Sequence, residues 1–433
     1  MNLFSSLRRA PWPQQLTTVA AFLVPGLALW LQSGYSYGAA LLFGGALLTV
    51  HRWPLQPHDR LTRWFAVSML AMALLWIALA DPQEHWGQWD RPAKFALGVV
   101  CLLFATRFPP RPSALFWGLL VGCIGAGAVA IWQVDIKGAE RASGHTNAIQ
   151  WGNLALLMAV MLGMFALCLR RQLSLWCKLL AGVAILAGLN ASVLSQSRGG
   201  WLALLLAIPL GLVLLYRINR AALWKVVAGL ATAIALISVI NVGLLAQRWN
   251  LVEKEVLVYG ERGDANTSVG QRLEHWRLAL DMGSERPLLG WGVAGYTAEK
   301  SARVAAGLYH PSIVEYKYVH NELLDLFVKT GLLGVAVVLC FYGLPLYMFW
   351  PSRTRMAVHD ADPGRRSLVL AVRLAGLCIP VLYIGFGLTQ VFFAHNSGIM
   401  FYTFMVTLVW AALLGLERGP LQAGAGPCAG VRP

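Results

Sequence analysis

The residue types best suited to chemistry in this sequence are one histidine and two arginines near the ends of apolar segments. His320 lies in VHNELLD (319–325) and Arg198 in SQSRGGW (195–201). Arg272 falls in the first turn of a helix that a Ser268-x-x-Gln271 capping box predicts. Histidine titrates near neutral pH and can serve as a general base, whereas arginine at a helix N-terminus suits an anion. We therefore interpret His320 as a catalytic candidate, Arg272 as an anion-binding candidate and Arg198 as a candidate for contact with a ligand.

The carboxylates that follow His320 have structural explanations. On a helix that includes His320, Asp325 projects roughly 140° away from it and can pair with Lys329 at i+4. Glu322 also points away, so no carboxylate of this helix is expected to orient the histidine. The spacing differs from HExxH, in which two histidines lie four residues apart, and we expect neither a metal ion nor any other cofactor.

The two arginines of the helix that begins near residue 268 differ in their surroundings. Arg277 has Glu274 and Asp281 within reach on the same helix, which explains it as a surface ion pair. Arg272 has no acidic residue at i+3 or i+4, although stacking on Trp276 would give it a structural role. The expected apolar stripe of this helix consists of Val269, Leu273, Trp276 and Leu280.

Other polar residues at the same ends of the apolar segments are weaker candidates. Arg198 could extend along the membrane interface, but its flanking serines and glycine pair favour close approach of a ligand. Most of the polar run from Glu140 to Asn153 fits an ordinary loop and helix cap, and Arg91 fits an interfacial residue. The possible secondary contacts are Arg141, His145, Asn147, Asn321 and Lys94.

The elements that position these residues are membrane helices. The chain has 433 residues, of which 58% are hydrophobic and 13% charged, and its mean hydropathy is +0.59. Apolar runs of about 20 residues recur along it, which predicts an all-α polytopic membrane protein. Twelve spans are expected near residues 15–32, 35–50, 64–80, 93–106, 114–134, 151–169, 174–194, 199–216, 221–246, 320–349, 367–391 and 396–416.

Charge in the short loops predicts the sidedness. With twelve spans, the loops rich in arginine and lysine fall on one side together with both termini, and the positive-inside rule makes that side cytoplasmic. This topology explains the net charge of +15 without nucleic acid. The expected order is nine spans within 1–246, a large ordered loop at 247–319, three spans within 320–416 and a cytoplasmic tail at 417–433. The candidates above then share the opposite face.

Two segments in this arrangement resemble the O-antigen ligase and polymerase superfamily. They are GQRLEHWRLALDMGSERPLLGWGVAGY (270–296) and HNELLDLFVKTGLLG (320–334), with SQSRGGW and RASGHTNAIQWGN (141–153) as upstream motifs. The resemblance covers roughly residues 140–340. It implies a GT-C type glycosyltransferase of the O-antigen ligase family, with the active site on the periplasmic face of a bacterial inner membrane.

The resemblance also implies the substrates and the roles. The donor would be a glycan on undecaprenyl pyrophosphate, and the acceptor a sugar hydroxyl of lipid A–core, both within membrane lipid. His320 would be the general base of a metal-independent, inverting transfer, and Arg198 and Arg272 would bind the pyrophosphate. Three alternatives stay open: an O-antigen polymerase, a protein O-oligosaccharyltransferase, and a flippase or transporter of lipid-linked glycan. The span interiors are poor in charge, which disfavours the transporter.

Overall fold

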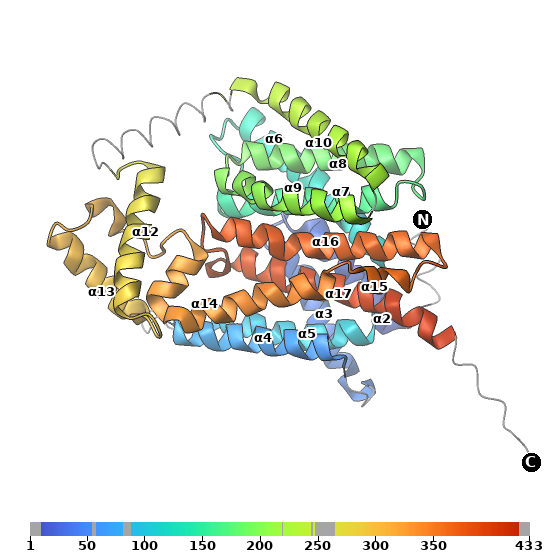
Figure 1. The fold of residues 1–433 in the computed structure, drawn as a ribbon, viewed down its shortest axis with the longest axis horizontal. Coiled ribbons are helices and arrows are strands. Elements are labelled where there is room, and N and C mark those ends of the chain that lie inside the picture. The colour runs from blue at the N-terminus through green and yellow to red at the C-terminus, as the bar shows by residue number, and fades with distance from the viewer. Residues whose placement is uncertain are drawn as a thin grey trace, which may run out of the picture.

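The computed structural model of the chain describes residues 10–53, 58–80, 88–218, 220–243, 246 and 265–423. Within these ranges the fold is built of helices joined by short connections (Figure 1). The α-helices are α2 (Trp12–Leu27), α3 (Tyr35–Thr49), α4 (Arg60–Ala78), α5 (Asp90–Arg107), α6 (Pro112–Ile131), α7 (Ala148–Cys168), α8 (Leu175–Leu194), α9 (Arg198–Ile218), α10 (Arg220–Ile240), α12 (Ser268–Glu285), α13 (Gly292–Ala305), α14 (Glu322–Phe349), α15 (Arg353–Ala357), α16 (Pro363–Gly387) and α17 (Asn396–Ala423).

The helices confirm a polytopic α-helical membrane protein. A helix lies at each of the twelve expected ranges, and seven helices of the described chain are long and apolar enough to cross a membrane. Twelve crossings therefore stay a prediction, as does the GT-C architecture. The expected domain bounds stay a prediction, including the cytoplasmic tail from residue 417; α17 continues to Ala423. Residues 424–433 and 247–264, the first part of the expected large loop, lie outside the described residues.

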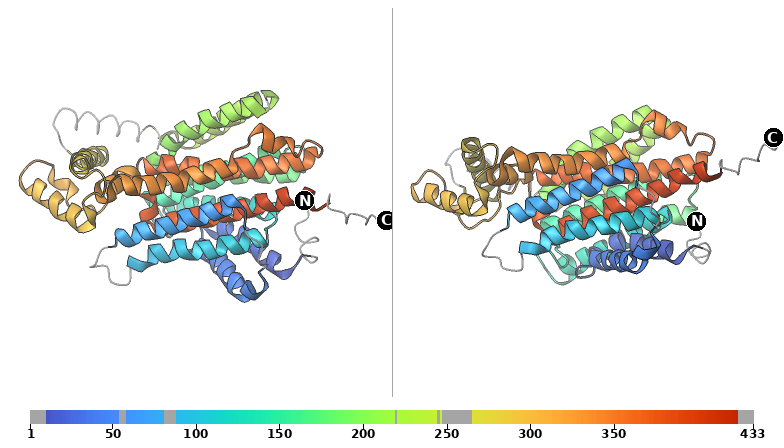
Figure 2. Two further views of the ribbon diagram at one scale, coloured as in Figure 1. Left: turned by 60° about the horizontal axis from the view of Figure 1, so that its bottom comes forward. Right: turned by 90° about the horizontal axis from the view of Figure 1, so that it is seen from below.

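The bundle is organised around α16 and α17. Within the most apolar stretch of each helix, 78% of α16 and 89% of α17 is buried inside the protein, against 39% for α8 and α14. Helices α16 and α17 are therefore central, and α8 and α14 are peripheral. Helices α12 and α13 lie beyond one end of this bundle in every view, and α15 lies at the other end (Figures 1 and 2). We call the end that carries α12 and α13 the site end.

Helix α12 packs against α14, but through a different face from the one its apolar residues suggested. The residues of its buried face are Gly270, Glu274, His275, Leu278, Ala279 and Met282, whereas Leu280 of the expected stripe is exposed. Two polar residues in the buried face hid this pattern. The expected cap was also wrong by one position, since the Thr267 hydroxyl accepts the Gly270 N–H at 3.0 Å and Thr267 is the N-cap.

A break in α14 joins the site end to the bundle. At Gly331 the backbone has φ +65°, which interrupts the helix and frees its backbone groups. The segment 287–291 satisfies them: Trp291 N–H donates to the Val328 carbonyl at 2.9 Å, and Leu332 N–H donates to the Pro287 carbonyl at 2.7 Å. A Cβ atom on Gly331 would lie 2.2 Å from the Leu288 backbone. The PLLGWG motif therefore docks on the break and fixes the first turns of α14.

Candidate active site

His320 lies just before α14 and is not part of it. Its φ is +60°, in the left-handed region, and the N-cap is Asn321, whose side-chain oxygen accepts the N–H groups of Leu323 and Leu324 at 3.1 Å. The expectation that the helix includes His320 was therefore wrong. Asn321 caps the N-terminus of α14, so the helix begins only after His320 and the histidine backbone is free to turn. A left-handed backbone at a histidine is uncommon and typical of a functional position.

A glutamine from a distant loop orients the His320 ring. Gln390, which is 5% exposed, lies between α16 and α17, and its Oε1 is 2.9 Å from His320 Nδ1. Its amide nitrogen lies 3.3 Å from Nε2 of His395. Because a carbonyl oxygen only accepts hydrogen bonds, Nδ1 of His320 carries the proton and donates a hydrogen bond to Gln390 Oε1. Nε2 of His395 accepts a hydrogen bond from the Gln390 amide group. This assignment leaves Nε2 of His320 with a lone pair that can accept a proton.

Two further rings surround His320. The ring centroids of His275 and Tyr316 lie 5.8 Å and 5.4 Å from that of His320, and the three rings pack edge to face. His275 is fully buried, and burial together with His320 lowers its pKa to about 3. His275 is therefore neutral, and its ring supports His320 without a competing charge.

The charge of Arg272 reaches His320. Burial is the largest influence and lowers the pKa of His320 below its ordinary value, and the positive charge of Arg272 lowers it further, while Gln390 opposes both. His320 is therefore neutral at pH 7 and able to act as a base. The structure thus brings together His320 and Arg272, two of the three principal residues selected from the sequence.

The third residue, Arg198, begins α9, and its side chain lies outside the described residues. The residues on either side of it show where its backbone lies. The Ser197 hydroxyl lies 2.7 Å from Oδ1 of Asn153, and a Cβ atom on Gly199 would lie 2.0 Å from the Thr389 hydroxyl. Since Thr389 precedes Gln390, the first turn of α9 contacts the loop that orients His320. The glycine permits this close approach.

The possible secondary contacts occupy ordinary structural positions. Arg141 donates to the Ser195 carbonyl at 3.0 Å, which supports the turn before Arg198. Asn147 caps α7, His145 is exposed, and Lys94 forms an ion pair with Asp90 on α5. Their contact with substrate stays a prediction.

The carboxylates near His320 make structural contacts, and the pairing of Asp325 with Lys329 is the one expected from the sequence. The Asp325–Lys329 ion pair is 2.7 Å long and buried, and Asp325 also accepts the Val319 N–H at 3.0 Å. Glu322 accepts the Phe392 N–H at 2.7 Å, which ties the start of α14 to the loop of Gln390. On α12, Arg277 pairs with Glu274 at 3.3 Å as expected, whereas Asp281 binds the Tyr309 hydroxyl. No cluster of three possible metal ligands occurs in the described part of the chain.

Lys300 of α13 binds the backbone of the segment 313–316, which precedes His320. Its ammonium group donates to the carbonyls of Ile313, Val314 and Tyr316, with distances of 3.3 Å and 3.1 Å to the first two. Burial, followed by the charge of Lys329, lowers its pKa to about 8. The backbone before Tyr316 is thereby fixed relative to α13.

Part of the chain is similar in sequence to known proteins. Residues 182–339 match the model of the family described as O-antigen ligase, a segment that includes Arg198, Arg272, His275 and His320. The chain carries an O-antigen ligase family domain. This family comprises glycosyltransferase-type membrane enzymes. The chain is also 27% identical to an uncharacterized protein of Haemophilus influenzae over 323 residues, which is 72% of this chain and 76% of the relative.

The O-antigen ligase domain does not contain the whole candidate site. Gln390 and His395 follow the matched segment by about 50 residues and come from the loop between α16 and α17. Sequence reasoning missed Gln390, His275 and Tyr316. The available signal was the polar stretch TQVFFAHNSG (389–398) between two apolar spans, in which a glutamine and a histidine interrupt the apolar pattern.

Proposed function

We propose that this O-antigen ligase family protein transfers a glycan from undecaprenyl pyrophosphate to a sugar hydroxyl of lipid A–core. The single observation that carries the proposal is the arrangement at His320. Its Nδ1–H is directed at Gln390, its Nε2 is available as a proton acceptor, and the charge of Arg272 acts on the same ring. A neutral base within reach of a positive charge suits a reaction that joins a hydroxyl to a carbon bearing a phosphate leaving group.

The proposed step is a single displacement. Nε2 of His320 accepts the proton of the acceptor hydroxyl as its oxygen attacks the anomeric carbon of the donor. The bond between that carbon and the pyrophosphate oxygen breaks, and the electron pair goes to the departing oxygen. Arg272 and Arg198 stabilise the negative charge that develops there, since guanidinium groups bind phosphate oxygens in pairs. Attack opposite the leaving group inverts the anomeric centre.

The proposed orientation follows the loop charges. The site end faces the periplasm of a bacterial inner membrane, and both termini are cytoplasmic. No ATP is available on that face, so the donor carries its own activation in the pyrophosphate bond. The transfer needs no metal ion, because the arginines replace the charge that a divalent cation supplies in other glycosyltransferases.

Purified protein mixed with lipid A–core, lipid-linked glycan and a metal chelator tests the proposal. Glycan attached to lipid A–core in the presence of chelator supports it. Longer lipid-linked chains would identify an O-antigen polymerase, and glycan on serine of a protein acceptor would identify a protein O-oligosaccharyltransferase. Movement of the donor across the bilayer without covalent product would identify a flippase.

A further inference from the structure

An exposed apolar pair lies at the site end, in the loop between α12 and α13. Leu288 and Leu289 are 69% and 72% exposed, and we call this pair the leucine tip. Proline and glycine flank it in PLLG (287–290), and Gly290 has φ +65°, so the chain turns sharply after the tip. Contacts within the protein therefore leave most of the apolar surface of the tip uncovered.

The leucine tip extends the exposed apolar surface of α14. Leu333 N–H donates to the Leu288 carbonyl at 3.4 Å, which adds to the bond between Leu332 and Pro287 at the break. Leu332 and Leu333 are exposed, and Leu339 continues this exposed stripe along the helix. Residues 330–349 contain no Asp, Glu, Lys, Arg or His. Exposed leucines that enlarge an apolar surface are typical of a contact with membrane or protein.

The length of α14 places the break near one edge of the hydrocarbon layer. From Leu332 to Trp350, the C-cap of α14, the helix rises about 27 Å. The hydrocarbon core of a bilayer is about 30 Å thick. Trp350 is followed by Arg353, and tryptophan with arginine is typical of the membrane edge. Leu332 therefore lies near the opposite edge, and the leucine tip lies beside it.

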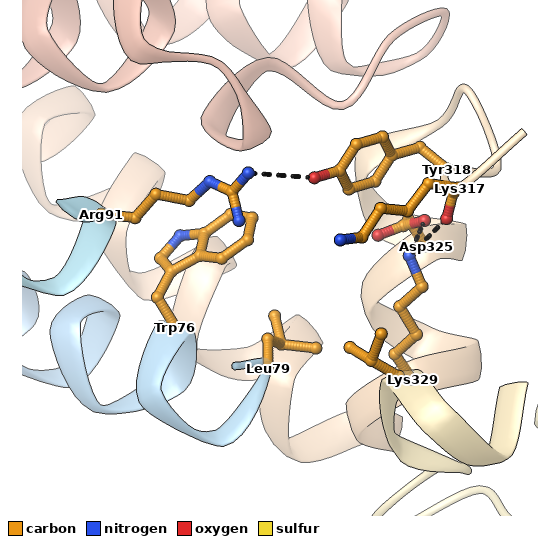
Figure 3. Close-up of a pocket in the computed structure, with 8 residues that line it drawn as sticks. Trp76, Leu79, Arg91, Lys317, Tyr318, Asp325 and Lys329 are labelled. Atoms are coloured by element: carbon orange, nitrogen blue, oxygen red, sulfur yellow. Dashed lines mark hydrogen bonds and ion pairs between the residues drawn. The ribbon is translucent and has the colours of Figure 1, made fainter. Parts of the chain in front are cut away.

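Polar groups on the other side of the break mark the same edge. Figure 3 shows Lys329 bonded to Asp325, at 2.7 Å, in the first turns of α14. Nearby, Arg91 of α5 lies 4.9 Å from the centroid of the Trp76 ring and donates to the Tyr318 hydroxyl at 3.2 Å. Arginine and tryptophan at the ends of membrane helices are typical of the head-group layer. The break in α14 therefore lies where the head groups meet the hydrocarbon.

An arginine and a tryptophan also flank the leucine tip itself. The Arg286 guanidinium lies 3.8 Å from the centroid of the Trp291 ring, and Arg286 is exposed. The Trp291 Nε1–H donates to the Met282 carbonyl at 2.7 Å, which ties the segment after the tip to α12. In interfacial anchors, apolar side chains enter the acyl layer while arginine and tryptophan stay at the head groups. The residues 286–291 have this composition.

We propose that Leu288 and Leu289 insert into the acyl layer of the leaflet at the site end and anchor α12 to the membrane surface. The partner is bulk membrane lipid, because the tip is continuous with the surface that α14 presents to lipid. Helix α12 carries Arg272 and His275. The anchor keeps these residues at the level where a lipid-borne substrate presents its head group. It does not depend on the transfer proposed above.

Depth-dependent fluorescence quenching in nanodiscs tests the anchor. The full chain, with its native cysteines replaced by alanine, carries a nitrobenzoxadiazole label on Leu289→Cys, Leu339→Cys or Leu308→Cys. We expect nitroxides on the lipid acyl chains to quench the label at residue 289 and to place it about 5 to 10 Å below the phosphates. The label at residue 339 should lie deeper, and the label at residue 308 should escape quenching.

Leu308 is the matched control. It is a 61% exposed leucine at the same end, and its backbone is bound within the α12–α13 unit. Its N–H donates to the Arg303 carbonyl at 3.1 Å, and its carbonyl accepts from Arg277 at 2.7 Å. Equal quenching at residues 289 and 308, or quenching of residue 289 by aqueous iodide alone, overturns the inference. Quenching of residue 289 that requires added lipid-linked glycan would assign the tip to the polyprenyl chain and also overturn it.

Amide hydrogen exchange in nanodiscs measures the effect on α12. The double variant Leu288→Ser, Leu289→Ser removes the apolar tip at exposed positions, so the fold should persist. We expect amides of α12 to exchange about tenfold faster than in wild type, because lipid no longer opposes the opening of this segment. Leu308→Ser should leave the exchange unchanged. Wild-type exchange in the double variant overturns the anchoring of α12.

Neither measurement uses glycan transfer. An unquenched label at residue 289 in a protein that glycosylates lipid A–core contradicts only the anchor. A quenched label in a protein that forms no product contradicts only the proposed function.

Discussion

Replacement of Gln390 by leucine should impair catalysis without removing any group that touches substrate. The substitution deletes the acceptor of the His320 Nδ1–H, whose hydrogen bond is 2.9 Å long, in a position that is 5% exposed. A neutral hydrogen bond contributes about 1 kcal/mol, and a buried N–H left without a partner costs about 1 to 3 kcal/mol. Since about 1.4 kcal/mol corresponds to a tenfold change in rate, we expect kcat to fall roughly 5- to 140-fold.

A second substitution at Gln390 separates orientation from charge. In the wild type, burial and Arg272 lower the pKa of His320 below 6.5, so activity should rise with pH below that value and be level above it. A carboxylate in Gln390→Glu favours the imidazolium and should raise the pKa of His320. The rising limb of the pH–rate profile should therefore move to higher pH, whereas Gln390→Leu should lower kcat without that displacement.

The assay is transfer of glycan to lipid A–core between pH 5 and pH 9. Gln172→Leu is the matched control, because Gln172 donates to the Gly364 carbonyl at 3.0 Å in an exposed position remote from His320. The control should have wild-type kinetics. Wild-type kcat in Gln390→Leu, together with an unchanged pH profile in Gln390→Glu, would refute the orienting role.

Three stability predictions follow from buried groups at the site end, each measured by thermal unfolding in detergent. The pKa of His275 is about 3 in the folded protein and near 6.5 in the unfolded chain, so its contribution to stability is complete above pH 6.5 and declines toward pH 3. At pH 5 the free energy of unfolding should be about 2 kcal/mol lower than at neutral pH because of this group. His275→Phe should remove this acid-induced loss. An identical acid loss in the variant would contradict this. Asp325→Ala leaves the buried Lys329 ammonium without its ion-pair partner and should lower the free energy of unfolding by about 3 kcal/mol. The double variant Asp325→Leu, Lys329→Met removes both charges and should lose less. Equal losses in the two variants would count against a buried ion pair. Gly331→Ala, at φ +65°, should lower the free energy of unfolding by about 1 to 3 kcal/mol. Gly343→Ala is the control and should be neutral, because a Cβ atom there meets no neighbour within 4 Å. Similar unfolding midpoints for the two variants would contradict the claim that the break in α14 requires glycine.

Hydropathy and charge were sufficient to predict the helices. Each expected span coincides with a helix, because about 20 apolar residues have no other low-energy arrangement in a bilayer. The expected boundaries were less accurate where polar residues sit inside the fold. The span expected to end at residue 391 ends at Gly387, which releases Gln390 into a loop.

The site was only partly predictable for a physical reason. His320 and Arg272 were selected from residue type and position, and the charge of Arg272 does act on His320. Gln390 was not selected, because its role depends on a contact between residues 70 positions apart that no local pattern encodes. His275 was not selected, since a histidine in a helix carries no sign of being buried against a second histidine.

The most direct test of the account is transfer by His320→Ala. The variant should remain folded and bind the lipid-linked glycan within about twofold, since the proposed pyrophosphate contacts belong to Arg272 and Arg198. Its product on lipid A–core should fall at least about 100-fold because the base is lost. Formation of product at the wild-type rate by folded His320→Ala would contradict the claim that His320 accepts the proton of the acceptor.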